Sequence, residues 1–224
     1  MTIALCFLPL VLCFLIYSFC LKIQITNQLT ATLLGLIAVF PISVIQYFLP
    51  PFTLFEQTPV LQTLLKSIIV YGFIEEFIKF LFLIPIPSKK LSEFEFLMLS
   101  FMAGLVLGCF ESAVYFLDHM QIAASKGAQL LLRQIFLRIF SADLIHMTCT
   151  GLCGLFLFSI RNKPTKFSVF MIAVLLHGTY DFFVGFQNPL KYFSIVVIIL
   201  AIIECQNKYL SLQNLCENRL TIFY

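Results

Sequence analysis

The sequence predicts an all-α, polytopic membrane protein in which about seven transmembrane helices surround a polar intramembrane site. Of its 224 residues, 61% are hydrophobic and only 11% are charged, whereas a soluble globular domain carries about 25% charged residues. Long apolar runs alternate with short polar or proline-rich breaks, as is typical of segments that cross a bilayer. The net charge is only +3, and no basic patch is interleaved with aromatic residues. We therefore expect the lipid bilayer, and no nucleic acid, as a partner.

The predicted helices follow from the positions of these breaks. The first run, 3–21, has no cation before it and no small-residue cleavage site after it, so we expect a retained transmembrane helix rather than a signal peptide. Pro41 is expected to kink the second helix, and the polar stretch 118–129 to connect two helices. The remaining predicted helices are 29–49, 59–84, 94–117, 130–160, 167–186 and 191–204. We expect one integral membrane domain over residues 1–224, with its motif-bearing core at about 59–186.

Basic residues at the helix ends indicate the orientation. The larger group falls on one side of the membrane and comprises Lys22, Lys89, Lys90, Arg161, Lys163, Lys166, Lys208 and Arg219. The smaller group, on the other side, comprises Lys126, Lys191 and, at its edge, Arg133. Because cytoplasmic loops carry the excess of lysine and arginine, we expect a multi-pass protein with its N-terminus outside and its C-terminus in the cytoplasm.

Seven of the ionisable residues inside the predicted helices are candidate site residues, since charge is costly there and by default indicates function. They are Glu75, Glu76, Lys79, Glu111, His146, His177 and Asp181. Glu75 and Glu76 lie four and three residues before Lys79, so the three cluster within about one helical turn. His177 and Asp181 are four apart and share one helix face. The sequence therefore predicts a polar interior rather than a simple membrane anchor.

The depth of each group follows from a rise of 1.5 Å per residue, counted from the predicted cytoplasmic end of its helix. Glu75 and His177 come out at roughly 14 and 15 Å, and His146 at roughly 21 Å. These three are expected to meet near the middle of the membrane. Glu111 comes out at roughly 26 Å, which places it toward the outer face.

These residue types suit hydrolysis by either of two mechanisms. A carboxylate in a low-dielectric pocket can act as general base toward a water molecule, with a histidine sharing that water or donating to the oxyanion. Alternatively, His146 and His177 with Glu75, Glu111 or Asp181 form a set that suits zinc. A non-catalytic membrane scaffold or an ion-coupled carrier is a third interpretation, because it would use the same polar interior.

Between the two mechanisms, the sequence favours a glutamate-activated water without a cofactor, with zinc as the alternative. Zinc sites fix each imidazole through a second partner. Asp143 is available to His146, but His177 has no obvious partner if Asp181 is itself a ligand. Lys79 also adds positive charge beside the proposed metal. The candidate ligands for zinc are His146, His177, Glu75 and Asp181.

Four motifs in order resemble the PrsW family of intramembrane proteases, which is related to the CAAX-processing endopeptidases and to the bacteriocin-processing CPBP proteins. The first is EExxK at 75–79, and the second is a glycine-rich stretch from Gly104 to Glu111. The third is His146 with glycines following it, and the last is HGxxD at 177–181. Two positions depart from the family pattern, Leu107 and Ser112, which leaves the ionisable set intact.

The resemblance implies a protease in the bacterial plasma (inner) membrane that cuts a membrane-anchored protein, such as an anti-sigma factor. It implies that Glu75 is the general base, with Glu76 and Lys79 shaping its charge. It further implies roles for the other four: His146 and His177 position the water or a metal, Asp181 supports His177 or the oxyanion, and Glu111 is a further carboxylate of the site.

Overall fold

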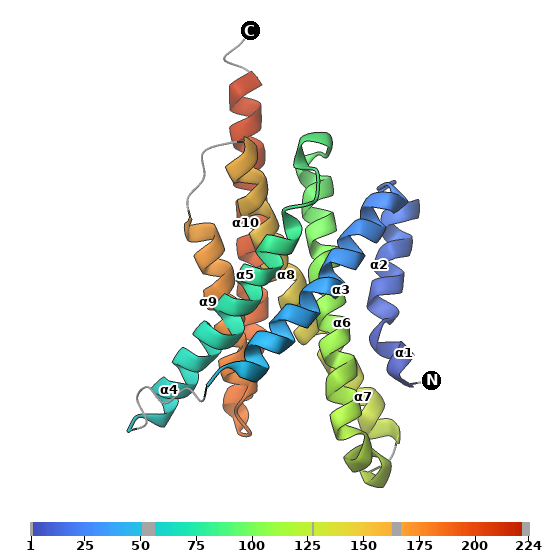
Figure 1. Ribbon diagram of the computed structural model, residues 1–224, viewed down its shortest axis with the longest axis vertical. Helices are drawn as coiled ribbons and strands as arrows, with labels where there is room; N and C mark the ends of the chain where they lie inside the picture. The colour runs from blue at the N-terminus through green and yellow to red at the C-terminus, as the bar shows by residue number, and fades with distance from the viewer. Residues whose placement is uncertain (1, 51–56, 127, 163–166, 221–224) are drawn as a thin grey trace.

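The computed structural model describes residues 2–50, 57–126, 128–162 and 167–220, and all secondary structure in these ranges is helical. This confirms the predicted all-α class. The chain runs back and forth along the long axis of the molecule (Figure 1). Its helices are α1 (Thr2–Cys6), α2 (Leu8–Phe19), α3 (Ile25–Phe48), α4 (Pro59–Lys66), α5 (Ile74–Leu83), α6 (Glu93–Lys126), α7 (Ala128–Ile139), α8 (Ala142–Asn162), α9 (Ser168–Val184) and α10 (Phe193–Leu220). A π-helical segment, η1 (Ser67–Phe73), joins α4 to α5, and short 3₁₀ turns, Ser88–Lys90 and Pro189–Tyr192, precede α6 and α10.

Several of these helices are long and apolar enough to cross a membrane, which confirms a polytopic membrane protein. Within the described residues, four helical stretches qualify by length and composition: Ile25–Phe48, Glu93–Leu117, Leu132–Asn162 and Pro189–Gln213. Two shorter apolar helices, α2 and α9, accompany them. Large apolar side chains point outward, as at Phe40 on α3 and Ile199 on α10, where lipid rather than water is a suitable solvent. The expected number of about seven crossings stays a prediction.

Three predicted boundaries are wrong. The polar stretch 118–129 is not a connection, because α6 continues to Lys126 and α7 begins at Ala128; its residues are mostly good helix formers despite their polarity. The predicted helix 130–160 is divided near Phe140, where the Ser141 amide donates to the Arg138 carbonyl in a tight turn. The last helix extends to Leu220 instead of ending at 204. Pro41 lies inside α3 without ending it.

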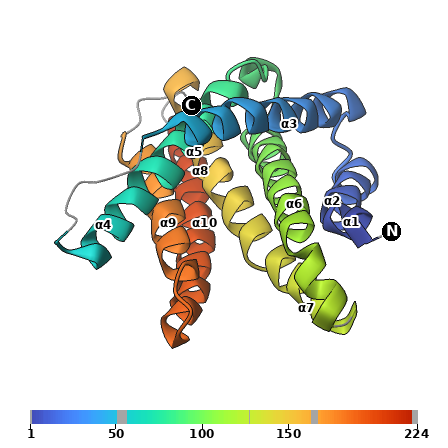
Figure 2. The same ribbon diagram turned by 60° about the horizontal axis from the view of Figure 1, so that its bottom comes forward.

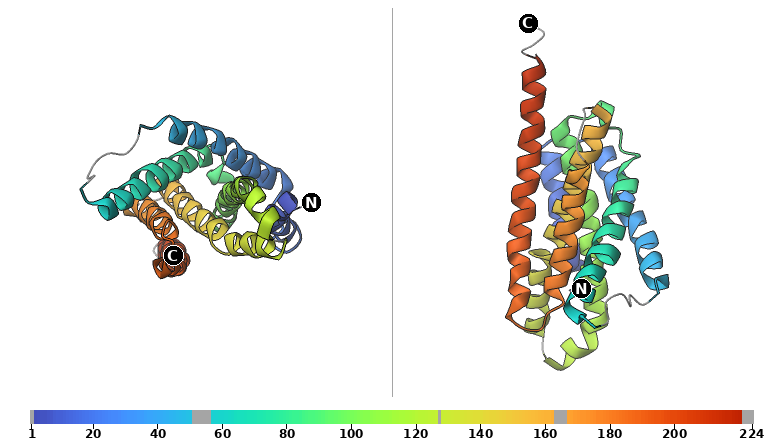
Figure 3. Two further views of the ribbon diagram at one scale, coloured as in Figure 1. Left: turned by 90° about the horizontal axis from the view of Figure 1, so that it is seen from below. Right: turned by 90° about the vertical axis from the view of Figure 1, so that its left-hand side faces the viewer.

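The core forms where α6, α8 and α9 pack together, with α8 buried along almost its whole length. Figure 3 shows α8 between α6 on one side and α9 and α10 on the other. The backbones of α6 and α8 touch at Gly104, where an added Cβ would lie 2.5 Å from the His146 carbonyl oxygen. Small residues at such crossings let membrane helices approach closely. This crossing brings α6 and the histidine of α8 together.

Helix α3 is a peripheral element, and it crosses the outer side of α5 and α6 (Figure 2). Only 28% of its most apolar stretch is buried, as in the stretch that contains α10, against 72% for α6. Its contact with α6 is made at Gly35, which approaches the backbone of Ala103. An inward stripe of buried residues, including Ala38 and Ile42, faces α5 and α6. The rest of α3 is left to lipid.

Candidate active site

The first turn of α5 carries Glu75 and Glu76, directly after the π-helical segment η1. A π turn widens the backbone and is frequent at functional sites. Gly72 in η1 packs against α9, because a Cβ there would lie 2.5 Å from the Val174 carbonyl oxygen and 3.0 Å from the Gly178 amide nitrogen. The close approach places the acidic turn of α5 beside His177, the neighbour of Gly178.

A residue of α8, Arg161, holds the C-terminal end of α5 in place. Arg161 donates to the carbonyl oxygens of Ile84 and Ile86 at 2.6 and 3.0 Å. These carbonyls follow the last turn of α5, where a cation also complements the helix dipole. Pro85 and Pro87 prevent the helix from continuing. The helix that presents the two glutamates is thus held at both ends by α8 and α9.

Glu76, Lys79 and His177 form the sealed half of the site. The side chains of Glu76 and Lys79 are 0% and 3% exposed, and Lys79 Nζ donates to Glu76 Oε1 at 2.7 Å. His177 Nδ1 lies 2.7 Å from the same oxygen, although the contact does not have hydrogen-bond geometry. Cys153 Sγ lies 3.4 Å from Glu76 Oε2. Both oxygens of Glu76 are therefore occupied by protein groups.

Glu75, Glu111 and His146 form the open half, because all three line a cavity. Glu75 Oε1 accepts a hydrogen bond from Gln46 Nε2 on α3 at 2.9 Å. Its other oxygen, Oε2, is buried yet has no hydrogen-bond partner among the described residues. A buried, unsatisfied carboxylate oxygen is costly, so it calls for a missing partner.

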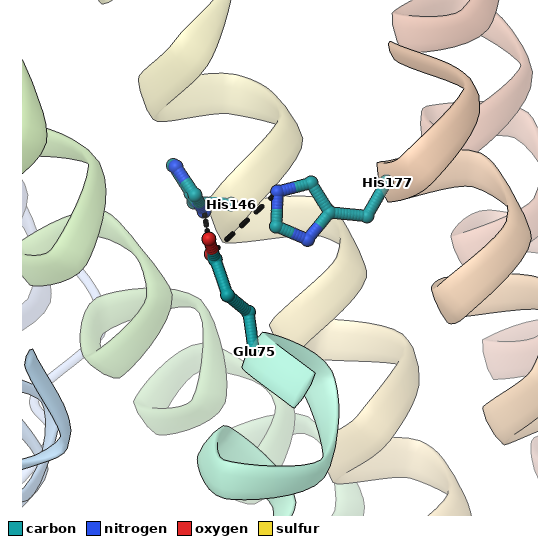
Figure 4. Close-up of side chains that lie close together, drawn as sticks. All are labelled: Glu75, His146 and His177. Carbon is teal, nitrogen blue, oxygen red and sulfur yellow. Dashed lines mark ion pairs between the residues drawn. The ribbon is translucent and has the colours of Figure 1, made fainter. Parts of the chain in front are cut away.

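Three nitrogen atoms surround the unsatisfied oxygen of Glu75 at longer range. Lys79 Nζ lies 3.7 Å away, and His146 Nδ1 and His177 Nε2 each lie 3.8 Å away. Figure 4 shows the Glu75 carboxylate pointing toward the two imidazoles, which come from α8 and α9. The rings stand nearly perpendicular, with their centroids 4.8 Å apart. A small group between these atoms would give Glu75 Oε2 the partner that it lacks among the described residues.

The tautomer of His146 can be assigned from its partners. Lys79 Nζ lies 3.0 Å from His146 Nδ1; an ammonium only donates, so Nδ1 accepts and the proton sits on Nε2. That Nε2 faces Glu111 Oε2 at 2.5 Å. His177 has carboxylates at both nitrogens, with Glu76 beside Nδ1 and Glu75 and Asp181 beside Nε2.

Glu111 adjoins the cluster, because its Oε2 faces His146 Nε2. Its expected depth, toward the outer face, stays a prediction. Arg138 Nη2 donates to Glu111 Oε1 at 2.9 Å, and Arg138 Nε donates to Ser112 Oγ at 3.3 Å. Arg138 thus holds the carboxylate that holds His146.

Asp143 and Asp181 have different surroundings. Asp143 is buried and accepts from Ser112 Oγ at 3.0 Å, with Cys109 Sγ at 3.8 Å. The prediction that Asp143 partners His146 is therefore wrong, because Glu111 occupies that place. Asp181 Oδ2 lies 3.6 Å from His177 Nε2, which is the pairing that their spacing on one helix predicts.

All seven predicted site residues lie in or against one cluster. Two further residues that contact the cluster were not predicted from the sequence. Gln46 on α3 contacts Glu75, and Arg138 on α7 contacts Glu111. The signal for Gln46 was a polar side chain within an apolar run. Gln28, on the same helix, carries the same signal and only bonds Ser18 and the Ile23 carbonyl. Polarity alone does not separate the two glutamines.

The residues around the unsatisfied oxygen also fit a divalent metal ion. Glu75, His146 and His177 each offer one ligand atom, and these atoms lie within 4.8 Å of one another. Two imidazoles and a carboxylate match a catalytic zinc site with a fourth position open. Glu111 and Glu76 face the outer nitrogens of the two rings, as the second partners of metal-bound histidines do. Glu76 is thus the carboxylate partner of His177 that the sequence did not reveal.

Comparison with known proteins agrees with the order of the motifs. The sequence model described as PrsW family intramembrane metalloprotease matches residues 24–203. The match covers all seven ionisable residues, together with Gln46 and Arg138. No curated protein and no solved structure matches the chain.

Proposed function

The chain belongs to the PrsW family of intramembrane metalloproteases, and from this premise we propose that it cuts membrane-anchored proteins at the cluster around Glu75. It is an intramembrane peptidase by its family, and its substrate is a protein embedded in the bilayer. We further propose which residues act and which substrates are cut. The single observation that carries it is the buried Oε2 of Glu75, which faces two imidazoles without a hydrogen-bond partner among the described residues.

In the proposed mechanism Glu75 is the general base. Its Oε1 is engaged by Gln46, so Oε2 is the oxygen that takes a proton from the attacking water. The same carboxyl later gives that proton to the leaving amine. General acid–base catalysis of this kind contributes about 10²–10⁴-fold to a rate. The water sits between Glu75 and the inward nitrogens of His146 and His177.

The remaining members of the cluster hold these groups in place. Glu111 orients His146 through Nε2, and Asp181 lies beside the inward nitrogen of His177. Lys79 neutralises Glu76 and places a positive charge 3.7 Å from Glu75 Oε2.

Alternatively, Glu75, His146 and His177 would hold a divalent metal ion, for which zinc suits the donor set; Glu75 would then be a ligand instead of the base, and Lys79 would give up its contact with His146 Nδ1. Such an ion supplies Lewis acidity, which polarises a carbonyl and makes a bound water more acidic. This proposal differs from the cofactor-free mechanism favoured by the sequence. Glu111 and Glu76 face the outer nitrogens of the two histidines, which removes the objection raised by His177, whereas the Lys79 ammonium still lies 3.0 Å from His146 Nδ1.

We also propose a location and a substrate class. The chain is one integral membrane domain of a bacterial inner membrane, and its substrates include membrane-anchored regulators such as an anti-sigma factor. The N-terminus lies outside and the C-terminus in the cytoplasm. In support, the α2–α3 and α5–α6 connections and the C-terminal end of α8 share one end of the molecule (Figure 1). Lys22, Lys89, Lys90 and Arg161 belong to these segments, whereas Lys163 and Lys166 lie outside the described residues, as does the side chain of Arg219.

The orientation is tested with accessibility tags. A tag inserted at 88–92 is expected to report the cytoplasm, and a tag beside Lys126, between α6 and α7, is expected to report the outside. A cytoplasmic tag beside Lys126 would contradict the proposed orientation and the crossing count before it.

The activity is tested with the purified protein in proteoliposomes that contain a panel of single-span peptides. We expect cleavage within the span, its loss on chelation, and its return with added zinc. The variants His146→Ala and His177→Ala should be inactive, while Arg133→Gln, a surface change on α7, should retain activity. If no peptide of the panel is cut by the zinc-loaded protein, the scaffold or carrier interpretation replaces this one.

A further inference from the structure

We propose that the cavity between α3 and α6 is the pocket for one aliphatic side chain of the substrate, adjacent to the peptide bond that is cut. The proposal rests on the proposed function, because it assigns a specificity-determining subsite to the same active site. It adds the chemical class of the residue that the protein selects, which neither the motifs nor the family match states.

The walls of the cavity are apolar. They consist of Val39 and Ile42 from α3 together with Leu107, Phe110 and Val114 from α6. Apolar walls with a few polar groups at one end are the usual composition of a site that binds an apolar group in a fixed orientation. An apolar side chain would lie against these walls and leave the polar groups of the lining, among them Ser43 and Gln46, to the substrate backbone.

The size of the cavity limits its occupant to one medium side chain. Its volume is about 130 Å³, well below the roughly 300–1,000 Å³ of pockets that take whole small molecules. A dry apolar cavity of about 150 Å³ holds benzene. The branched side chains of valine, leucine and isoleucine, and the flexible one of methionine, fit such a space. Phenylalanine is larger than these side chains, and alanine leaves most of the cavity empty.

The inner end of the cavity is the reaction centre itself. Glu75 and His146 line it together with the apolar residues. A side chain that fills the cavity therefore brings its own backbone beside the unsatisfied oxygen of Glu75. Because a substrate must be held in near-attack geometry to react, the residue in the cavity decides which peptide bond is presented.

The cavity also reaches the lipid-facing surface, so a membrane-embedded segment has access to it from the side. Ser43 on α3 and Val114 on α6 line it and are exposed, the latter by 41%. Glu111 keeps 53% of its side chain exposed at the same place. The hydroxyl of Ser43 and the amide of Gln46 lie on the α3 side, where they can bond the backbone of an unwound substrate helix.

The first arm of the test asks whether the cut follows an aliphatic residue. Single-span peptides with an alanine-only central segment receive one leucine, which is moved along the segment, and the products are mapped by mass spectrometry. We expect the cut to stay at a fixed distance from the leucine. Leucine should be preferred over alanine or phenylalanine at that place by about tenfold or more, since a methylene in an apolar pocket is worth about 10–200-fold.

A change in the wall of the cavity gives a matched comparison. Val114→Phe fills the cavity from its exposed side, where the new ring faces lipid as well and does not disturb the core. We expect it to lower the ratio of cleavage of the leucine peptide to cleavage of the alanine-only peptide by about tenfold or more. Leu117→Phe, one turn further along α6 and 49% exposed, does not line the cavity and should leave the preference intact.

The second arm measures binding without cleavage. Peptides with a photoreactive diazirine leucine at the selected position are irradiated with the Glu75→Gln variant, and the adducts are mapped. Adducts on the cavity residues of α3 and α6 support the pocket even if no peptide is ever cut, in which case only the proposed function fails. Cleavage that ignores the leucine, or adducts that fall elsewhere, overturns the pocket and leaves the proposed function standing.

Discussion

Glu75 and Glu76 are consecutive and chemically equivalent, yet the fold gives them opposite surroundings. Glu76 belongs to the sealed half, where Lys79 and His177 meet one of its oxygens at 2.7 Å each. Glu75 belongs to the open half, where one oxygen is bonded by Gln46 and the other faces a cavity. Consecutive residues of an α-helix differ by about 100° in direction, so one glutamate points into the core and its neighbour toward α3.

The contacts of the two glutamates show which carboxylate is free to react. A group whose oxygens are all engaged by buried cations and donors has no capacity for substrate or water. A group with an unsatisfied oxygen beside a cavity has that capacity. We therefore interpret the sealed half as the support that fixes the charges and the open half as the reactive part. The predictions below separate the two halves.

The largest expected effect is on catalysis in the open half. Glu75→Gln keeps the shape of the side chain but cannot accept a proton, so cleavage in proteoliposomes should fall by about 10³-fold. The melting temperature of the detergent-solubilised protein should stay close to that of the wild type. Residual cleavage near the wild-type rate would remove Glu75 as the base.

The next effect is on stability in the sealed half. Glu76→Leu leaves the buried ammonium of Lys79 without its closest partner, which typically costs about 3–5 kcal/mol. Thermal or denaturant unfolding of the purified protein would measure the loss. The double change Glu76→Leu with Lys79→Met removes both charges and should recover much of the stability. If Glu76→Leu alone melts like the wild type, the sealed half is not a structural ion pair.

A smaller effect is expected from Arg138, which acts through Glu111 and His146. Arg138→Gln releases Glu111 Oε1. Residues that hold a metal ligand in place without touching the metal typically contribute about 10–100-fold to metal affinity or activity. Cleavage and zinc affinity should fall together, because His146 loses its fixed orientation. Arg133→Gln on the same helix is the control. A loss of cleavage at unchanged zinc affinity would show that Arg138 has another role.

The smallest effect is expected from Gln46. Gln46→Ala removes one hydrogen bond to Glu75 Oε1, and a net contribution of about 0.5–1.5 kcal/mol per bond corresponds to roughly a threefold to tenfold loss of cleavage rate. The neighbouring Tyr47, which is 82% exposed, supplies the control Tyr47→Phe. Cleavage unaffected by Gln46→Ala would mean that Glu75 needs no orientation from α3.

Much of the fold followed from the apolar runs, because a bilayer admits helices and little else at its centre. The errors arose where polarity was taken as a sign of a connection. The segment 118–126 is polar and still helical, and the turn at Phe140 and Ser141 carries no proline or glycine. Local composition does not distinguish a helix that projects from the membrane from a loop, so these boundaries needed tertiary structure.

The site was predictable in its members and less so in its contacts. The spacings of Glu75 to Lys79 and of His177 to Asp181 each put two residues on one helix face, and both pairs lie close together. Residue spacing does not predict which side chains of different helices come into contact. Glu111 rather than Asp143 meets His146, and Gln46 reaches Glu75, because the crossings at Gly104 and along α3 decide which faces meet.

The central claim is that Glu75, His146 and His177 together form a metal-binding reaction centre, and metal content measured beside cleavage tests it most directly. We predict about one zinc ion per chain by elemental analysis of the active protein, as expected for a catalytic site. The ion and the activity should be lost together in His146→Ala and in His177→Ala and should both be kept in Arg133→Gln. Protein that cleaves its peptide at the full rate after chelation, without bound metal, would contradict the claim.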